Sequence, residues 1–156
     1  MSGESKTQET GPSMINLSIK ERIAAFVLQT PDAYKSLDIS GNTMGESKSP
    51  LPSQTIIADE RSQRGASVNQ KYLETITKIQ DVWQQQIRNL SIDKFHLTDD
   101  QGSITVTTDR NYRIYFNLTN DIDKQIIRLA AFLADSSIEQ PQEYLDLRYE
   151  DHLYAK

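Results

Sequence analysis

Few side chains in this 156-residue sequence stand at spacings that catalysis or metal binding would use. The two histidines, His96 and His152, are far apart, and neither has a carboxylate at ligand spacing. A zinc site or a Ser-His-Asp triad would need further groups brought in by the fold, so we expect both histidines to be surface residues. The sequence has no cysteine, which excludes disulfides, thiolate metal sites and cysteine nucleophiles. We expect no metal and no cofactor.

Carboxylates are plentiful, but they occur where acidic residues are expected for structural reasons. Three acidic clusters fall in predicted turns or at a predicted helix start: Asp99-Asp100, Asp121 with Asp123, and Glu150-Asp151. No general acid or base stands out, and we expect a protein that is not an enzyme. The alternative is an enzyme that assembles a carboxylate pair in three dimensions. Two buried carboxyl groups with raised pKa values in one cleft would support it.

Charge and composition narrow the classes of partner. The chain has 17 Lys and Arg against 22 Asp and Glu, a net charge of -5, and no basic run. Nucleic acids and anionic membranes both require clustered basic side chains, and the scattered glycines form no phosphate-binding loop. We therefore expect no nucleic acid and no small-molecule substrate. The longest apolar stretches, Ile23 to Leu28 and Leu129 to Ala134, are far shorter than the roughly 20 residues that span a bilayer.

The side chains best suited to binding lie near the C-terminus. Asp146 and Arg148 stand two apart on a predicted strand, so they can pair on one face. The plain interpretation is a structural ion pair worth under about 1 kcal/mol, and the functional one is that the pair orders an edge that receives a partner. A terminal edge strand leaves backbone groups unpaired, which invites strand addition. The other candidates for partner binding are aromatic or apolar: Tyr144, Tyr149, His152, Leu153 and Tyr154. The pattern equally allows Tyr149 and Leu153 to cap the core.

The elements that must position these residues follow an α+β pattern. Helical periodicity predicts helices over 68–88 and 121–136, with a capping box at Ser67 and Gln70 and a cap at Asn120. Trp83 continues the apolar stripe of the first helix, which favours a core position. Strands are predicted over 14–22, 23–29, 34–39, 55–58, 90–97, 103–108, 112–118, 144–149 and 152–156. Broken alternation near Asp93 and Lys94 predicts a bulge.

Composition also divides the chain into parts. Residues 1–13 have no apolar pattern, which predicts a disordered lead-in. The segment ESKSPLPS, residues 46–53, holds two of the five prolines and no periodic apolar signal. Such a segment favours a boundary between modules, which separates 14–52 from 53–156.

Two co-linear stretches resemble the FtsQ/DivIB family of bacterial cell-division proteins. The C-terminal YLDLRYEDHLYAK resembles the closing strands of that family, and it follows a YFNL-type strand at 115–118. The N-terminal INLSIKERIAAFVL, YKSLDISGN and Leu51-Pro52 are similar to a v-x-I-x-E-R-x-P strand, a y-x-x-D-x-x-G hairpin and an L-P boundary of the family. Ala24 stands where the family usually has proline.

The resemblance implies an antiparallel or mixed sheet with two amphipathic helices, in which 14–52 is the C-terminal half of a POTRA-like domain and 53–156 an FtsQ/DivIB-type β domain. It implies a divisome scaffold that binds FtsB and FtsL by β-strand addition at its C-terminal edge during septum formation. The full-length protein would cross the plasma membrane once and hold these domains on the extracytoplasmic face at the division site, and this chain would lack the anchor. The alternative is a POTRA-type chaperone or binding module of outer-membrane protein assembly or secretion.

Overall fold

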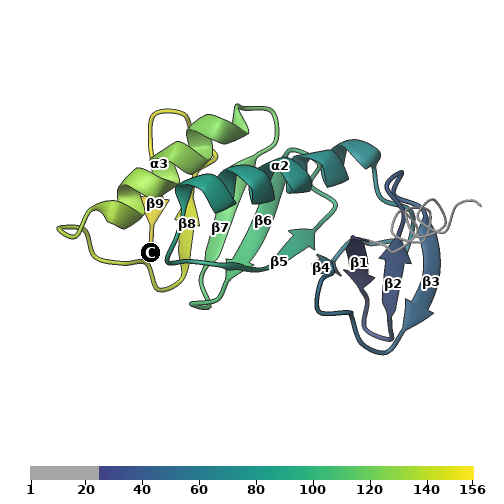
Figure 1. The fold of residues 1–156 in the computed structure, drawn as a ribbon. Helices are drawn as coiled ribbons and strands as arrows, with labels where there is room; N and C mark the ends of the chain where they lie inside the picture. Colours follow the sequence, from purple (N-terminus) through teal and green to yellow (C-terminus); the bar gives the residue numbers. More distant parts are fainter. Residues whose placement is uncertain (1–24) are drawn as a thin grey trace, which may run out of the picture.

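A computed structural model describes residues 25–156 of the chain. The lead-in predicted at 1–13 and the strand predicted at 14–22 lie outside these residues. The α+β class is confirmed, since the described residues form one mixed sheet of nine strands with two helices (Figure 1). The strands are β1 (Phe26–Gln29), β2 (Tyr34–Leu37), β3 (Thr43–Ser47), β4 (Thr55–Asp59), β5 (Ile92–Leu97), β6 (Ser103–Thr108), β7 (Arg113–Asn117), β8 (Tyr144–Asp146) and β9 (Tyr154–Ala155), and the helices are α2 (Gln70–Gln86) and α3 (Ile122–Ala134).

The order of the strands explains why both helices lie on one face. The sheet runs β3-β2-β1-β4-β5-β6-β7-β8-β9. Two pairs of parallel neighbours are joined by a helix: α2 connects β4 to β5, and α3 connects β7 to β8. Both connections advance in the same direction across the sheet, and such crossovers are almost always right-handed, so both helices cover the same face. Figure 1 shows α2 and α3 side by side on this face.

A single apolar core fills the space between the helices and the sheet. Alternate strand residues such as Val106 and Phe116 point toward the helices and are fully buried, as are Ile79 of α2 and Leu129 of α3. Burying each such side chain contributes about 1.5–3 kcal/mol. Trp83 belongs to this core as predicted, and its indole N–H donates to the carbonyl of Leu90 at 2.8 Å. Within residues 25–156, neither helix is long and apolar enough to cross a membrane.

The core and the sheet both continue across the boundary predicted at 52/53. β4 pairs with β1 on one side and with β5 on the other. Leu28 and Leu37, which precede the boundary, belong to the same apolar cluster as Trp83 and Leu129. The boundary stays a prediction.

The predicted order of elements from residue 68 onward is confirmed, but both helix caps differ from prediction. Asn69, not Ser67, caps α2, and its side-chain oxygen accepts from the Lys71 N–H at 2.8 Å. The reason is that the Val68 N–H donates to the carbonyl of Gly41 at 2.7 Å, which holds the chain at the β2–β3 turn. Gly41 has a φ of 90°, and a Cβ there would collide with the Val68 carbonyl.

At α3, Asp121 rather than Asn120 is the cap, and its carboxylate accepts from the Asp123 N–H.

Three strands depart from prediction, and each is largely exposed or short. β3 was missed, because all of its residues are exposed and their types do not alternate. β8 ends at Asp146 instead of Tyr149, and β9 covers only Tyr154 and Ala155 of the strand predicted at 152–156. The bulge predicted in β5 is confirmed by a register shift between Ile92 and Lys94.

Candidate functional site

The residues predicted to bind a partner lie in and around β8 and β9, and their exposure divides them. Tyr149 is 52% exposed and Tyr154 is 50% exposed, with ring centroids 5.5 Å apart in an edge-to-face arrangement. The exposed His152 ring lies 6.0 Å from that of Tyr154. We call Tyr149, His152 and Tyr154 the aromatic cluster. Leu153 is half-buried against the core, so it does cap the core, whereas Tyr149 does not.

Next to the aromatic cluster, β9 forms one edge of the sheet. Its inner side pairs with β8, with Asp146 opposite Tyr154 and Leu145 opposite Ala155. The ladder continues at Lys156, whose N–H donates to the Tyr144 carbonyl at 3.0 Å. Because β9 is the last strand in the sheet order, its outer side pairs with no other strand of residues 25–156. Backbone groups on that side are available to an added strand.

Helix α3 fixes the connection that carries the aromatic cluster. The Arg128 guanidinium donates to the carbonyl of Leu147 at 2.9 Å and to that of His152 at 3.5 Å. These two carbonyls lie at opposite ends of the segment that leads from β8 to β9. The helix therefore holds this segment in place before any partner arrives.

The predicted pair of Asp146 and Arg148 is confirmed, and its geometry is bidentate. Arg148 donates from Nε to Asp146 Oδ1 at 2.9 Å and from Nη2 to Oδ2 at 2.7 Å, and its backbone N–H adds a third bond. Burial raises the pKa of Asp146, but the bonds from Arg148 outweigh this and hold that pKa below its usual range. The guanidinium lies 5.0 Å from the ring centre of Tyr115. Nη1 has no hydrogen-bond partner in the part of the chain that the structure describes, so it can donate to a partner.

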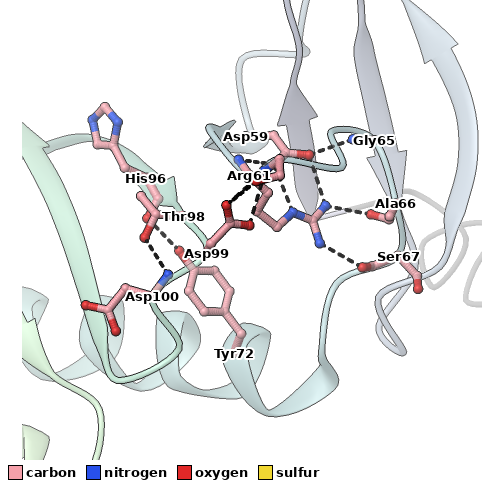
Figure 2. Close-up of polar contacts among 11 residues, drawn as sticks. Asp59, Arg61, Gly65, Ala66, Ser67, Tyr72, His96, Thr98, Asp99 and Asp100 are labelled. Carbon is pink, nitrogen blue, oxygen red and sulfur yellow. Dashed lines mark hydrogen bonds and ion pairs between the residues drawn. The ribbon is translucent and has the colours of Figure 1, made fainter.

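A second pair with the same spacing was missed by sequence reasoning. Arg61 donates to Asp59 from Nε and Nη2, both at 2.9 Å, and Asp59 also accepts from the Gly65 N–H (Figure 2). Arg61 further donates to the carbonyls of Ala66 and Ser67, so it holds the loop that leads into α2. Burial raises the pKa of Asp59, but the bonds from Arg61 and Gly65 lower it below its usual range. The signal that could have found this pair is the D-x-R spacing shared with Asp146 and Arg148.

The prediction that His96 is a surface residue was wrong. Its side chain is 8% exposed, because β5 lies inside the sheet with β4 and β6 as neighbours. Nδ1 lies 2.8 Å from Oε2 of Glu60, and Nε2 lies 2.5 Å from Oγ1 of Thr107. His152 is exposed, as predicted.

Thr107, His96 and Glu60 follow the hydroxyl, imidazole, carboxylate order that nucleophilic catalysis uses. That chemistry also requires donors for an oxyanion. Thr107 lies on β6, which is paired on both sides, so the backbone N–H groups around it belong to the sheet ladder. The three residues therefore act together as a link between β4, β5 and β6.

The other enzyme hypothesis required paired carboxyl groups with raised pKa values. The two buried carboxylates of residues 25–156, Asp59 and Asp146, both have lowered pKa values and belong to separate arginine pairs. No group of three His, Asp or Glu side chains that could hold a metal occurs in the same range.

A cavity of about 420 Å³ opens beside the start of α2, between the loop after β4 and the β5–β6 turn. Polar groups of its lining are bonded to neighbouring residues. The Tyr72 hydroxyl donates to the His96 carbonyl at 3.0 Å (Figure 2), and Asp99 accepts from the backbone N–H and the hydroxyl of Ser62. Asp100 likewise accepts from the Gly102 N–H at 2.9 Å. These bonds join the loop, the turn and the helix to one another.

Comparisons with known proteins assign no family. No family model matches this chain, and no curated protein matches it either.

Proposed function

We propose that this chain is a non-enzymatic binding domain of a bacterial division scaffold of the FtsQ/DivIB type. In this proposal, 14–52 is POTRA-like, 53–156 is the β domain, and the full-length protein is held at the extracytoplasmic face of the plasma membrane. The partner is of the FtsB or FtsL type. The observation that carries the proposal is the outer edge of β9, which pairs with no strand of residues 25–156 and lies beside the exposed rings of Tyr149 and Tyr154.

An added strand would bind this edge in three ways. Its backbone would continue the ladder of β9, as in other cases of β-strand addition. The aromatic cluster would supply large, rigid contact area, which is the usual source of interface energy. Arg148 would donate from Nη1, which has no partner within residues 25–156, to an acidic side chain of the partner. Because Arg128 already fixes the connecting segment, little ordering would be required on binding.

The test measures binding of the extracytoplasmic parts of the FtsB and FtsL proteins from the same genome by calorimetry. We expect Tyr154→Glu and deletion of residues 151–156 each to weaken binding at least about tenfold, which is about 1.4 kcal/mol. The matched control is Met44→Glu, since Met44 is 47% exposed on β3, at the opposite edge of the sheet. Circular dichroism checks that the helices persist. Unchanged affinity in both C-terminal variants would rule out the mechanism.

The alternative function, a POTRA-type chaperone, can be tested at β3, the opposite edge of the sheet. Every residue of β3 is exposed, so this strand is also open to an extended chain. If the protein is a POTRA-type chaperone, peptides copied from outer-membrane barrel strands should bind, and Met44→Glu should weaken them while Tyr154→Glu does not. If the protein is a division scaffold, Tyr154→Glu should weaken binding of the FtsB and FtsL proteins and Met44→Glu should not.

A further inference from the structure

A groove of about 550 Å³ lies where the two helices end, at the end of the molecule opposite the aromatic cluster. Its walls come from the residues after α2, the last turn of α3 and the β6–β7 turn. Helix α3 connects the parallel strands β7 and β8, so its C-terminus, and the groove beside it, lie near the start of β8. Tyr154 of the aromatic cluster pairs with Asp146, at the other end of β8. Half of the residues that line the groove are apolar: Ile87, Leu90, Ala130, Leu133, Ala134 and Ile138.

The charge of the groove is opposite to that of the chain. Among the described residues, 25–156, the only charged side chains that line it are Arg88 and Arg110, while the whole chain has a net charge of -5. Both arginines are exposed, and neither forms an ion pair with any residue of 25–156. The Arg110 guanidinium donates one bond, from Nη2 to the Asn89 carbonyl at 2.9 Å, and no bond of the Arg88 guanidinium is found among these residues. Most of the guanidinium N–H groups therefore have no partner within residues 25–156.

We propose that this groove binds an acidic, amphipathic segment of a partner protein. Aliphatic side chains of the segment would occupy the apolar floor, and carboxylates on its flank would pair with Arg88 and Arg110. Arginine is well suited to this because its planar guanidinium can bind a carboxylate through two parallel bonds. Acidic residues beside leucine or isoleucine at helical spacing would satisfy both features.

The same features argue against an anionic membrane as the occupant. Recognition of anionic lipid uses clusters of roughly four to eight basic residues on one surface. Two arginines on a chain with net charge -5 fall short of this, and their position around a recessed apolar floor suits a peptide.

A structural role for the two arginines makes a different prediction. Both helices end at this groove, and neither has a basic residue in its last turn. Arginines placed nearby offset the negative ends of the helix dipoles. If that were their whole role, replacing them would lower the melting temperature and would leave peptide preference unaltered.

The experiment selects random twelve-residue peptides displayed on phage against the intact protein. We expect enrichment of sequences with Asp or Glu beside Leu or Ile at helical spacing, and amide shifts by NMR in 86–90 and 130–140. A synthetic copy of an enriched peptide should bind the R88E/R110E double variant at least tenfold more weakly than it binds the unmodified protein. It should also bind the Ile138→Ser variant more weakly. The matched control is the R64E/R113E double variant, because both of these arginines are exposed, form no ion pair within 25–156 and give the same change of charge.

Five outcomes would overturn the proposal. Enriched peptides without acidic residues, shifts confined to other surfaces, or equal weakening by the control variant would each contradict it. So would binding of the protein to anionic phospholipid vesicles that the R88E/R110E variant loses, with no acidic peptide enriched. Melting temperatures of all variants are measured in parallel. A lowered melting temperature in R88Q/R110Q with unchanged peptide affinity would assign the arginines to the helix ends alone.

Discussion

The two Asp-x-Arg pairs have the same spacing and different surroundings, which gives them different roles. Arg61 donates to Asp59 and to two loop carbonyls, and its side chain is 16% exposed. Within residues 25–156, the Arg148 side chain donates to Asp146 alone, lies against Tyr115 of β7 and is 37% exposed. The first pair is therefore enclosed and stabilises a loop, while the second is more open to solvent.

We expect Asp59→Ala to lower the free energy of unfolding by about 3 kcal/mol, because it leaves the enclosed Arg61 without its carboxylate. Urea denaturation measures this change. The control is Asp123→Ala, which removes the exposed pair of Asp123 and Lys78, 3.5 Å apart, and should cost under about 1 kcal/mol. Equal losses in the two variants would contradict the assignment of Asp59 as a buried anchor.

The lowered pKa values of Asp59 and Asp146 predict the direction of acid destabilisation. In the unfolded chain these carboxyl groups have pKa values of about 3.9. Their pKa values in the folded protein are lower, so their contribution to stability is present above the unfolded value and is lost as pH falls through the folded values. Melting temperatures between about pH 5 and pH 2 should therefore fall less steeply in Asp59→Asn, which has no proton to bind at this position. If the melting temperature of Asp59→Asn fell with pH as steeply as that of the unmodified protein, a lowered pKa of Asp59 would be refuted.

His96 shows why the environment of single residues could not be predicted from the sequence alone. The broken alternation around the bulge in β5 obscured which side chains lie on which face. Glu60 and Thr107 contact the ring from positions 36 and 11 residues away in the chain. Only strand pairing brings them together, and no local spacing encodes that pairing. By contrast, the pairing of Asp146 with Arg148 was predictable because it is local.

At the scale of elements, the helix caps differ most clearly from the sequence prediction. We expect Asn69→Ala to lower stability by about 1 kcal/mol, because its side chain accepts a backbone N–H of the first turn of α2. Ser67→Ala should change stability by no more than a few tenths of a kcal/mol, since only the backbone carbonyl of Ser67 is engaged by Arg61. Thermal denaturation of the two variants distinguishes the observed cap from the capping box. A larger loss of stability in Ser67→Ala than in Asn69→Ala would show that Ser67 caps α2, as the predicted capping box requires.

The elements that sequence analysis predicted well are those with one buried face. The two helices and β6 have apolar residues at the period of their structure, since half of each element packs into the core. β3 and β9 are exposed throughout, so burial imposes no alternation on their residues. The proposed binding edge consists of such an element, and it was predicted from its terminal position, its nearby aromatic residues and the resemblance of 144–156, not from alternation.

At the scale of the whole molecule, the two crossovers place different features at the two ends of the strands. The two arginine pairs lie where β4 and β8 end, each with its aspartate on the strand and its arginine in the loop that follows, and the helices start at this end. The helices end at the other side, beside the groove lined by Arg88 and Arg110. The proposed partner strand and the proposed acidic segment would therefore bind at separate places, so each can be tested by variants that leave the other unaltered.

The continuity of the sheet predicts that residues 25–52 unfold together with the rest of the described chain. Leu37 lies on β2, is fully buried and shares a cluster with Trp83, the only tryptophan of the sequence. Leu37→Ala should therefore lower stability by about 2–5 kcal/mol and shift the unfolding midpoint seen by Trp83 fluorescence, although Trp83 lies beyond the predicted boundary at 52/53. Met44→Ala, on the exposed edge of the same segment, should leave the midpoint in place. If Leu37→Ala also left the fluorescence midpoint unchanged, the two parts would unfold independently, and the boundary would separate two folding units despite their shared sheet.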